Sequence, residues 1–182
     1  MPRLNIYETI PLFAASGIGL GVFSSNGALR IRGVYIPGSI SFNQVAVVFN
    51  NNSVVANSLS ISFGLYSLSN NSTLNLANSA SFSSTYSATI ISWLTLATSA
   101  TQDITPGNWY FGVVVSQSNH TDFGLLGNTD QPVVSVYGGP AMRGQYRSTT
   151  NNIPSTIHTS DILKDDTAPN QRGVQAYVLI SA

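Results

Sequence analysis

Apolar and polar residues alternate with a period of two along most of this chain. The segment 59–65 reads LSISFGL, in which every second residue is large and apolar, and the segments 109–115 (WYFGVVV) and 174–180 (VQAYVLI) repeat the pattern. Successive side chains of a β-strand point to opposite faces, so this period predicts strands with one buried face. Further strands are predicted at 29–36, 43–50, 88–96 and 133–137.

Short clusters rich in glycine, proline, asparagine and serine separate these segments. They read SSNG at 24–27, PGS at 37–39, NNNS at 50–53, SNNS at 69–72 and TPGN at 105–108. These residue types favour tight turns, and no long segment shows the 3.6-residue period of a helix. The pattern therefore predicts an all-β fold, a single jelly-roll-like antiparallel β-sandwich over residues 1–182.

One stretch departs from the alternation. From residue 138 to 173 the period lapses, three prolines occur, and seven of the 14 charged residues of the chain are found. We expect a long irregular charged arm here, next to the C-terminal strand, because loops of this length in compact domains are usually functional or covered by a partner. A short helical turn is predicted at 160–164 within it. At the other end, residues 1–28 are predicted to form an N-terminal arm and a first strand.

The charge content is low enough to restrict the function. Charged residues make up 8% of the chain, against about 25% in an ordinary soluble domain. The formal net charge is zero, and residues 33–102 contain no charged side chain. Because no basic stripe is present, we expect no nucleic-acid or membrane partner. A neutral surface gives a free monomer little protection against association, so we expect other copies of the chain to cover it.

Residues with catalytic or metal-binding chemistry are few. The chain has no cysteine and two histidines, of which His120 lies near Asp122 and His158 lies near Asp161. The first pair lacks a visible third metal ligand, and the second lacks a serine nucleophile in a recognisable turn motif. None of the seven acidic residues falls within the central strands from 33 to 102, so a pair of catalytic carboxylates is not indicated. We expect no enzyme activity, no metal and no cofactor.

Exposed aromatic and arginine side chains are the candidates for recognition. Trp93, Trp109, Tyr110, Tyr137 and Tyr146 could stack on sugar rings, but Trp109 shares the phase of the apolar strand positions, which favours packing in the core or an interface. Tyrosine and arginine are typical interface residues. The predicted contact residues, all in or beside the charged arm, are Tyr137, Arg143, Tyr146, Arg147, Asp161 and Lys164.

Three pieces of the sequence resemble β-sandwich domains of virion proteins in tailed bacteriophages. The first is SFGLYSL (62–68) with STLNL (72–76) and NS (78–79), the second is ITPGNWYFG (104–112), and the third is IPSTI (153–157) with SDIL (160–163) and AYVLI (176–180). The resemblance spans residues 57–182 and supplies no catalytic residue. It implies a protein of the virion surface, in head decoration, collar or tail fibre.

The resulting hypothesis is a structural subunit of a phage virion, most specifically a capsid-decoration or cement protein. Its expected partners are other copies of itself, arranged as a trimer, and the major capsid or tail proteins. The alternative is a tail-fibre or collar domain that binds a glycan of the host surface.

Overall fold

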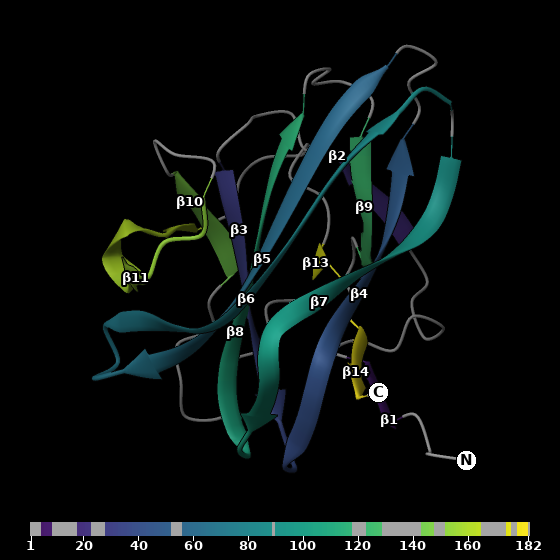
Figure 1. Cartoon of the computed structure of the whole chain (residues 1–182). Coiled ribbons are helices and arrows are strands. Elements are labelled where there is room, and N and C mark those ends of the chain that lie inside the picture. Colours follow the sequence, from purple (N-terminus) through teal and green to yellow (C-terminus); the bar gives the residue numbers. More distant parts are fainter. Residues whose placement is uncertain are drawn as a thin grey trace.

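A computed structural model describes residues 5–8, 18–22, 28–51, 56–88, 90–117, 123–128, 143–147, 152–164, 174–175 and 178–181. These residues form 14 β-strands and one short 3-10 helix (Figure 1). The strands are β1 (Asn5–Glu8), β2 (Ile18–Val22), β3 (Ala28–Ile36), β4 (Ile40–Asn51), β5 (Asn57–Ser69), β6 (Thr73–Tyr86), β7 (Ile90–Ile104), β8 (Gly107–Gln117), β9 (Phe123–Asn128), β10 (Arg143–Arg147), β11 (Thr156–His158), β12 (Leu163–Lys164), β13 (Val174–Gln175) and β14 (Val178–Ser181). The 3-10 helix η1 covers Thr159–Asp161.

All strand pairs are antiparallel, which confirms the all-β antiparallel fold expected from the period-two pattern. The hydrogen-bonded order is β1-β14-β4-β7-β6-β5-β8-β3-β10-β12, with β2 and β13 beside β9, β9 also beside β4, and β11 beside β6. No α-helix occurs among the residues that the structure describes. The first and last of these strands, β1 and β14, pair with each other.

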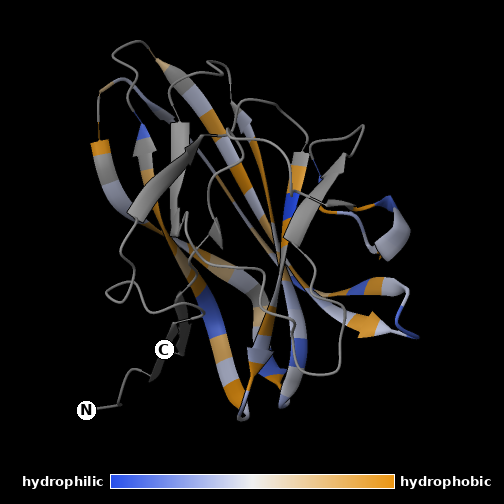
Figure 2. Cartoon of the chain, turned by 180° about the vertical axis from the view of Figure 1, so that it is seen from behind, coloured by the Kyte–Doolittle hydropathy of each residue, from blue (hydrophilic) through white to orange (hydrophobic). Residues whose placement is uncertain are grey.

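The hydrogen-bonded sheet bends back where β6 meets β7, so that its two parts pack against each other. These two strands are joined at the single pair Ala80↔Thr98 and diverge on either side of it, as Figure 1 shows. As a result β4 and β7 face β3, β5, β6 and β8 across one apolar cluster. Its largest fully buried members are Phe42, Phe49, Phe63 and Phe111. Figure 2 shows the alternating apolar and polar bands along these long strands.

Strand β8 is buried on both of its faces, which the sequence pattern did not show. Trp109 and Phe111 pack toward the main cluster, as expected from their phase. On the opposite face Tyr110 is fully buried in a second apolar cluster together with Tyr66 and Val114. A second layer of chain must therefore cover this outer face.

Three of the five predicted turns fall where the structure reverses direction, and the other two, at 24–27 and 50–53, lie wholly and partly outside the described residues, respectively. Pro37 to Ser39 connects β3 to β4, and Thr105 and Pro106 connect β7 to β8. Asn70 and Asn71, between β5 and β6, have φ angles of 51° and 55°. Two consecutive positive φ values characterise the hairpin turn whose twist matches that of the flanking strands, and asparagine tolerates this conformation better than most residues.

The expectation of an irregular arm at 138–173 needs a correction, because the described part of this range contains three short strands. Strand β10 pairs with β3, β12 pairs with β10, and β11 pairs with β6. The signal was missed because these strands have two to five residues, too few for a period to be visible. The predicted helical turn at 160–164 is also displaced: the structure has one 3-10 turn at Thr159–Asp161, and strand β12 follows it.

The remaining strand predictions agree with the structure where it describes the chain. β3, β4, β5, β7 and β8 contain or overlap the predicted segments and are mostly longer than predicted, and β13 and β14 fall within 174–181. The predicted strand at 133–137 lies outside the described residues. In the N-terminal part, β1 and β2 lie within the predicted arm-and-strand region 1–28.

Candidate functional site

The six predicted contact residues are distributed over three neighbouring elements and one part of the chain that is not described. Arg143, Tyr146 and Arg147 lie on β10, and Lys164 lies on the adjacent strand β12. Asp161 is exposed at the end of η1, and Tyr137 lies outside the described residues. The structure thus brings β10 and β12 together at one end of the strand order.

Register divides the residues of β10 between two faces. Arg143 lies opposite Arg32 and Arg147 lies opposite Ala28, whereas Tyr146 lies opposite Leu29. Positions directly opposite each other share a face, and neighbouring positions along a strand alternate. Tyr146 is therefore on the face of Leu29, and the two arginines are on the other face. That these residues form one recognition cluster stays a prediction.

Two further basic residues, which are not among the predicted contact residues, lie on the strand next to β10. Arg30 and Arg32 lie on β3, and Arg30 is opposite Gln145 of β10. They are more than one hundred positions away from β10 in the chain, and no local motif connects them. The one signal in the sequence is that both arginines, two positions apart, are the charged residues of an otherwise largely apolar strand.

The segment 152–162 covers the lower part of the outer face of β5, β6 and β8. Ile153, Ile157 and Ile162 pack into the second apolar cluster, against Tyr66 and Tyr110 among others. The Tyr66 hydroxyl donates a hydrogen bond of 3.1 Å to the Pro154 carbonyl oxygen. Backbone hydrogen bonds run from the Leu76 N–H to the Ser155 carbonyl and from the Thr159 N–H to the Ser72 carbonyl, both at 2.9 Å. This segment of the predicted arm is therefore part of the fold.

A bulge in β6 makes this covering possible. The register passes from Leu65↔Asn78 to Tyr66↔Leu76, so Ala77 is an extra residue on β6. One extra residue moves every following side chain to the opposite face. Leu74 and Leu76 consequently contact the covering segment on the outer face, while Ala80 and Phe82, at positions of the same parity, pack toward the main cluster.

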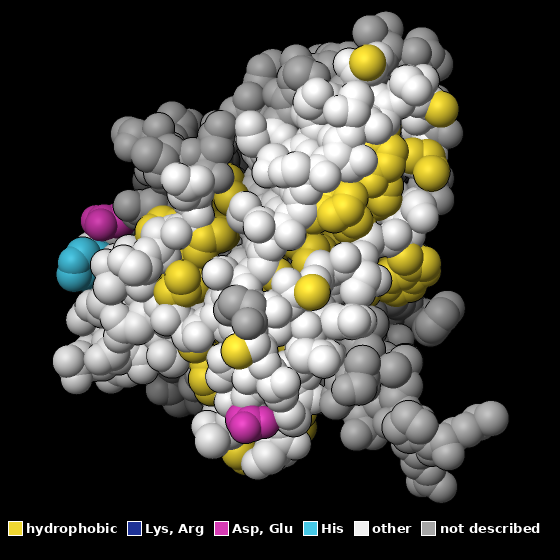
Figure 3. Space-filling model, in the orientation of Figure 1, with side chains coloured by type: hydrophobic (Ala, Val, Ile, Leu, Met, Phe, Trp, Pro, Cys, Tyr) yellow, Lys and Arg dark blue, Asp and Glu magenta, His cyan; other side chains and the backbone are white. Residues whose placement is uncertain are grey.

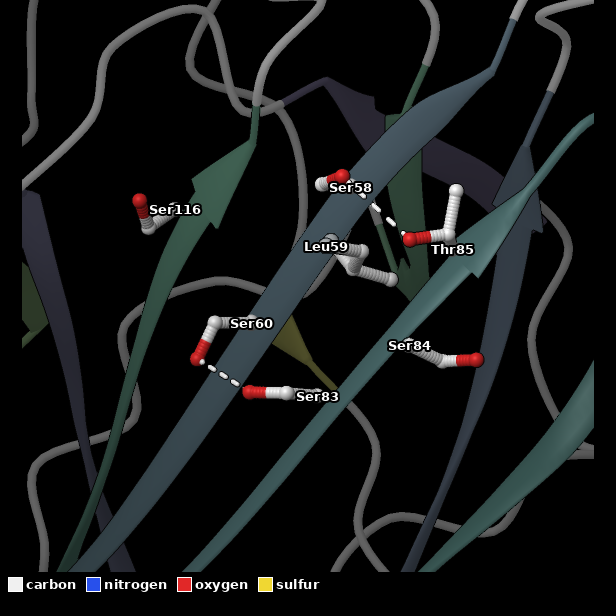
Figure 4. A pocket seen from close by; sticks show the side chains of 7 residues that line it. All are labelled: Ser58, Leu59, Ser60, Ser83, Ser84, Thr85 and Ser116. Carbon is white, nitrogen blue, oxygen red and sulfur yellow. Dashed lines mark hydrogen bonds between the residues drawn. The ribbon is translucent and has the colours of Figure 1, made fainter.

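Above the covering segment, the same outer face is lined by hydroxyl groups (Figure 4). Ser83 donates a hydrogen bond of 3.1 Å to Ser60, and the hydroxyls of Ser58 and Thr85 lie 3.3 Å apart, each pair joining β5 to β6. These residues line a shallow concavity of about 600 Å³, whose full lining is Ser58, Leu59, Ser60, Ser83, Ser84, Thr85 and Ser116. The face is polar and uncharged, as the alternation of serine with apolar residues predicts.

The largest exposed apolar side chain is on β7. Trp93 is 54% exposed, and Ile90 at the start of the same strand is 38% exposed. The other tryptophan, Trp109, is half-buried, and its indole N–H donates to the Thr105 carbonyl oxygen at 2.9 Å. Of the aromatic residues proposed to stack on sugars, Trp93 is thus open to solvent and Tyr110 is buried. Burial also raises the pKa of the Tyr110 hydroxyl.

Charged side chains are scarce on the part of the surface that the structure describes. Among the side chains whose burial is described, the charged ones are Arg30, Asp103 and Asp161, and Arg30 is buried. Figure 3 shows hydrophobic and uncharged surface over most of the face that it draws. Among these residues, the charged side chains that reach the surface are therefore Asp103 and Asp161.

The side chains of His158 and Asp161 have different polar neighbours in the structure. The Nδ1 atom of His158 lies 3.4 Å from the Thr73 hydroxyl, and Asp161 accepts a hydrogen bond of 3.3 Å from Ser160. Neither of these two contacts joins His158 to Asp161. No group of three histidine or acidic residues lies close enough to hold a metal within the described ranges. His120 and Asp122 lie outside them.

None of the helices that the structure describes has the length and apolar character needed to cross a membrane. In comparisons with known proteins, no family model and no curated protein matches this sequence.

Proposed function

We propose that this chain is a structural subunit of a bacteriophage virion, a capsid-surface decoration protein that packs as a homo-oligomer and folds as a jelly-roll-like β-sandwich. The observation that carries the proposal is the uncharged surface of the strand block 40–117, in which Asp103 is the one charged residue. A surface of this kind favours association, and a subunit that is permanently packed against neighbours has no need of charge for solubility.

The open edges of β6 and β7 support the same function. Within the described residues, β6 has no strand partner on its β7 side from residue 81 to 86, and β7 has none on its β6 side from 90 to 97. Free strand edges are normally protected by lysine or proline, and neither residue occurs in these two ranges. Trp93 and Ile90 are exposed along the β7 edge. A neighbouring subunit at this place would cover both the edges and the aromatic side chain.

The test is the mass of the native protein combined with binding to purified phage capsids or tails. We expect a complex larger than the 19.3 kDa chain, with three copies as the expected number, and co-sedimentation with particles. The variant Ser83→Lys places a charge on the exposed side of β6 beside the open edge and should release monomers. Ser160→Lys, on the exposed turn η1, is the matched control and should assemble like the unmodified protein. A stable monomer that binds neither capsids nor tails contradicts the proposal.

The exposure of Trp93 favours one second candidate, a glycan-binding domain of a tail fibre or collar. An indole ring that is open to solvent can stack on a sugar ring. The hydroxyls of the neighbouring β-strand positions, such as Thr95, can donate and accept hydrogen bonds. A glycan array read with the unmodified protein and with Trp93→Ala tests it: binding that the variant loses supports the glycan function, and an array without hits argues against it.

A further inference from the structure

A regular array of hydroxyl groups runs along the outer face of β5 and β6. Three consecutive cross-strand pairs of this face are hydroxyl pairs: Ser58↔Thr85, Ser60↔Ser83 and Ser62↔Ser81. The first two pairs are joined by hydrogen bonds (Figure 4). Residues two positions apart on a strand share a face and lie about 7 Å apart, so the pairs repeat at that spacing.

This array lines two adjoining concavities. The concavity of about 600 Å³ contains the first two hydroxyl pairs, and a second one, of about 430 Å³, begins at the third pair. The lining of the second concavity is Ser62, Ser79, Ala80, Ser81, Ala97 and Ile153. Because the third pair directly follows the second along both strands, the concavities lie end to end on one face. We call them together the serine trough.

The serine trough is long and narrow. From Thr85 to Ser79 it follows β6 for six residues, which corresponds to about 20 Å. One end is formed by Ile153 of the covering segment, whose Cγ2 atom would lie 2.8 Å from a Cβ atom on Gly64. Ala97 of β7 contributes to the lining near the point where β6 meets β7. An elongated ligand fits this shape better than a compact one.

The chemistry of the trough favours a neutral ligand. Among the residues that the structure describes, its lining contains no charged side chain, so an ion bound there would lose hydration without gaining an opposite charge. A serine hydroxyl offers one donor and two acceptor lone pairs. Ser83 donates its proton to Ser60, so this pair retains one donor and three lone pairs. A ligand whose own groups both donate and accept, such as the hydroxyls of a sugar, matches this lining.

The lower part of the same outer face shows the contrasting case of a bound polypeptide segment. The segment 152–162 is held there by Ile153, Ile157 and Ile162 in the second apolar cluster. In the serine trough the apolar residues Leu59 and Ala80 are buried, and hydroxyl groups make up most of the rest of the lining. Protein interfaces have an apolar centre, so this lining suits a carbohydrate better than another polypeptide.

We propose that the serine trough binds a linear polysaccharide of neutral sugars. Each hydrogen bond to the trough contributes little because water competes for it, so binding depends on a chain that contacts several hydroxyl pairs at once. The inference does not rest on the virion function. The site is also separate from Trp93, which lines neither concavity.

The test is retention of the full chain on beads of cellulose, cross-linked amylose and cross-linked dextran, three neutral glucans. The carboxymethylated form of each polymer, which carries anionic groups on the same sugar chain, is the comparison. We expect retention on at least one neutral polymer and weaker retention on its charged form, because the trough has no cation to compensate the carboxylates.

A double variant and two controls decide where the polymer binds. Ser60→Ala combined with Ser83→Ala removes the central hydroxyl pair and should weaken retention about tenfold. Ser155→Ala combined with Ser160→Ala removes two exposed hydroxyls from the covering segment and should be retained like the unmodified protein. Trp93→Ala should also be retained. An unchanged Tm shows that the Ser60 and Ser83 variant is folded, and its native mass should be unchanged because no charge is introduced.

Four results overturn the proposal. They are the absence of retention on all three neutral polymers, equal or stronger retention on the charged forms, retention that survives the loss of the Ser60 and Ser83 hydroxyls, and an altered native mass of that double variant. The last result would mean that the trough is a contact between subunits.

Discussion

Two glycines that face each other across β5 and β8 determine how closely the covering segment approaches. Gly64 and Gly112 are directly opposite in register. A Cβ atom on Gly64 would lie 2.8 Å from Ile153 Cγ2 and 2.9 Å from Tyr66 Cε2, and one on Gly112 would lie 2.9 Å from Leu29 Cδ1. These distances are too short for carbon atoms, so the absence of a side chain at both positions lets the ring of Tyr66 and the segment 152–162 pack on the sheet.

Gly64→Ala should therefore destabilise the protein by about 1–3 kcal/mol, the usual cost of overpacking a filled site. Urea unfolding gives the free energy of unfolding for this comparison. Gly38→Ala is the control, because a Cβ atom there would meet nothing within 4 Å, and its change should stay within about 0.5 kcal/mol. Adding Ile153→Ala to Gly64→Ala should reduce the cost of the glycine substitution, since the nearest contact is removed. Equal stability of the Gly64 and Gly38 variants would contradict this packing.

The buried hydroxyl of Tyr110 makes stability depend on pH at the alkaline end. Burial raises its pKa above the ordinary value of 10.0, so the folded state holds this proton more tightly than the unfolded chain does. The contribution is complete below pH 10 and is lost as the pH rises toward the folded pKa, because the unfolded state ionises first. The free energy of unfolding should fall above pH 10 more steeply in the unmodified protein than in Tyr110→Phe. Parallel curves for the two proteins would show that Tyr110 does not contribute.

Among the elements, the short strand β11 depends most on side-chain packing. It has three residues and pairs with Thr73 to Asn75 at the lower end of β6. Ile157, its central residue, is 1% exposed within the second apolar cluster. A three-residue strand has too few hydrogen bonds to hold a segment in place by itself, so the burial of this side chain provides most of the attachment.

Ile157→Ala should thus cost about 2–4 kcal/mol and expose the segment 152–162 to protease cleavage before the rest of the protein unfolds. The control is Thr156→Ala at the neighbouring exposed position of the same strand, for which we expect little change. Limited proteolysis followed by mass determination reports the first cleavage site. Cleavage at the same sites and rate in both variants would mean that the covering segment is held by other contacts.

The alternation of apolar residues predicted the long strands, because each long strand has one face in the main apolar cluster. β5 and β8 were evident in this way from Phe63 and Phe111 and their neighbours of the same parity. The covering segment was not, because Ile153, Ile157 and Ile162 follow one another at intervals of four and five residues, which fits neither a strand nor a helix. Its burial depends on the extra residue Ala77 in a distant strand, and nothing local to 152–162 signals that.

Which basic residues lie on neighbouring strands could be predicted from the sequence only in part, for a related reason. Arg143 and Arg147 are close together in a charged stretch of the sequence, whereas Arg30 and Arg32 lie on the neighbouring strand only because β3 pairs with β10. Register between strands that are more than one hundred residues apart is a property of the whole fold. The hydroxyl face, in contrast, could be predicted from the sequence. Ser60 and Ser83 lie on strands joined by a short hairpin, and the alternation of serine with apolar residues already predicts that both side chains are on the outer face.

For the molecule as a whole, the proposed association predicts that stability depends on protein concentration. If native subunits associate and unfolded chains do not, mass action makes Tm rise with concentration. The contacts available at the open edges of β6 and β7 are apolar and hydroxyl groups, and Asp103 is the one charge in the block 40–117, so sodium chloride should change this rise little. Differential scanning calorimetry over a hundredfold concentration range measures both effects.

The rise of Tm with concentration should disappear in Ser83→Lys and persist in Ser160→Lys, because a lysine beside the open edge repels a second strand, whereas a lysine on η1 does not. A Tm that is independent of concentration in the unmodified protein, or the same rise in both lysine variants, would place the subunit contact elsewhere or remove it.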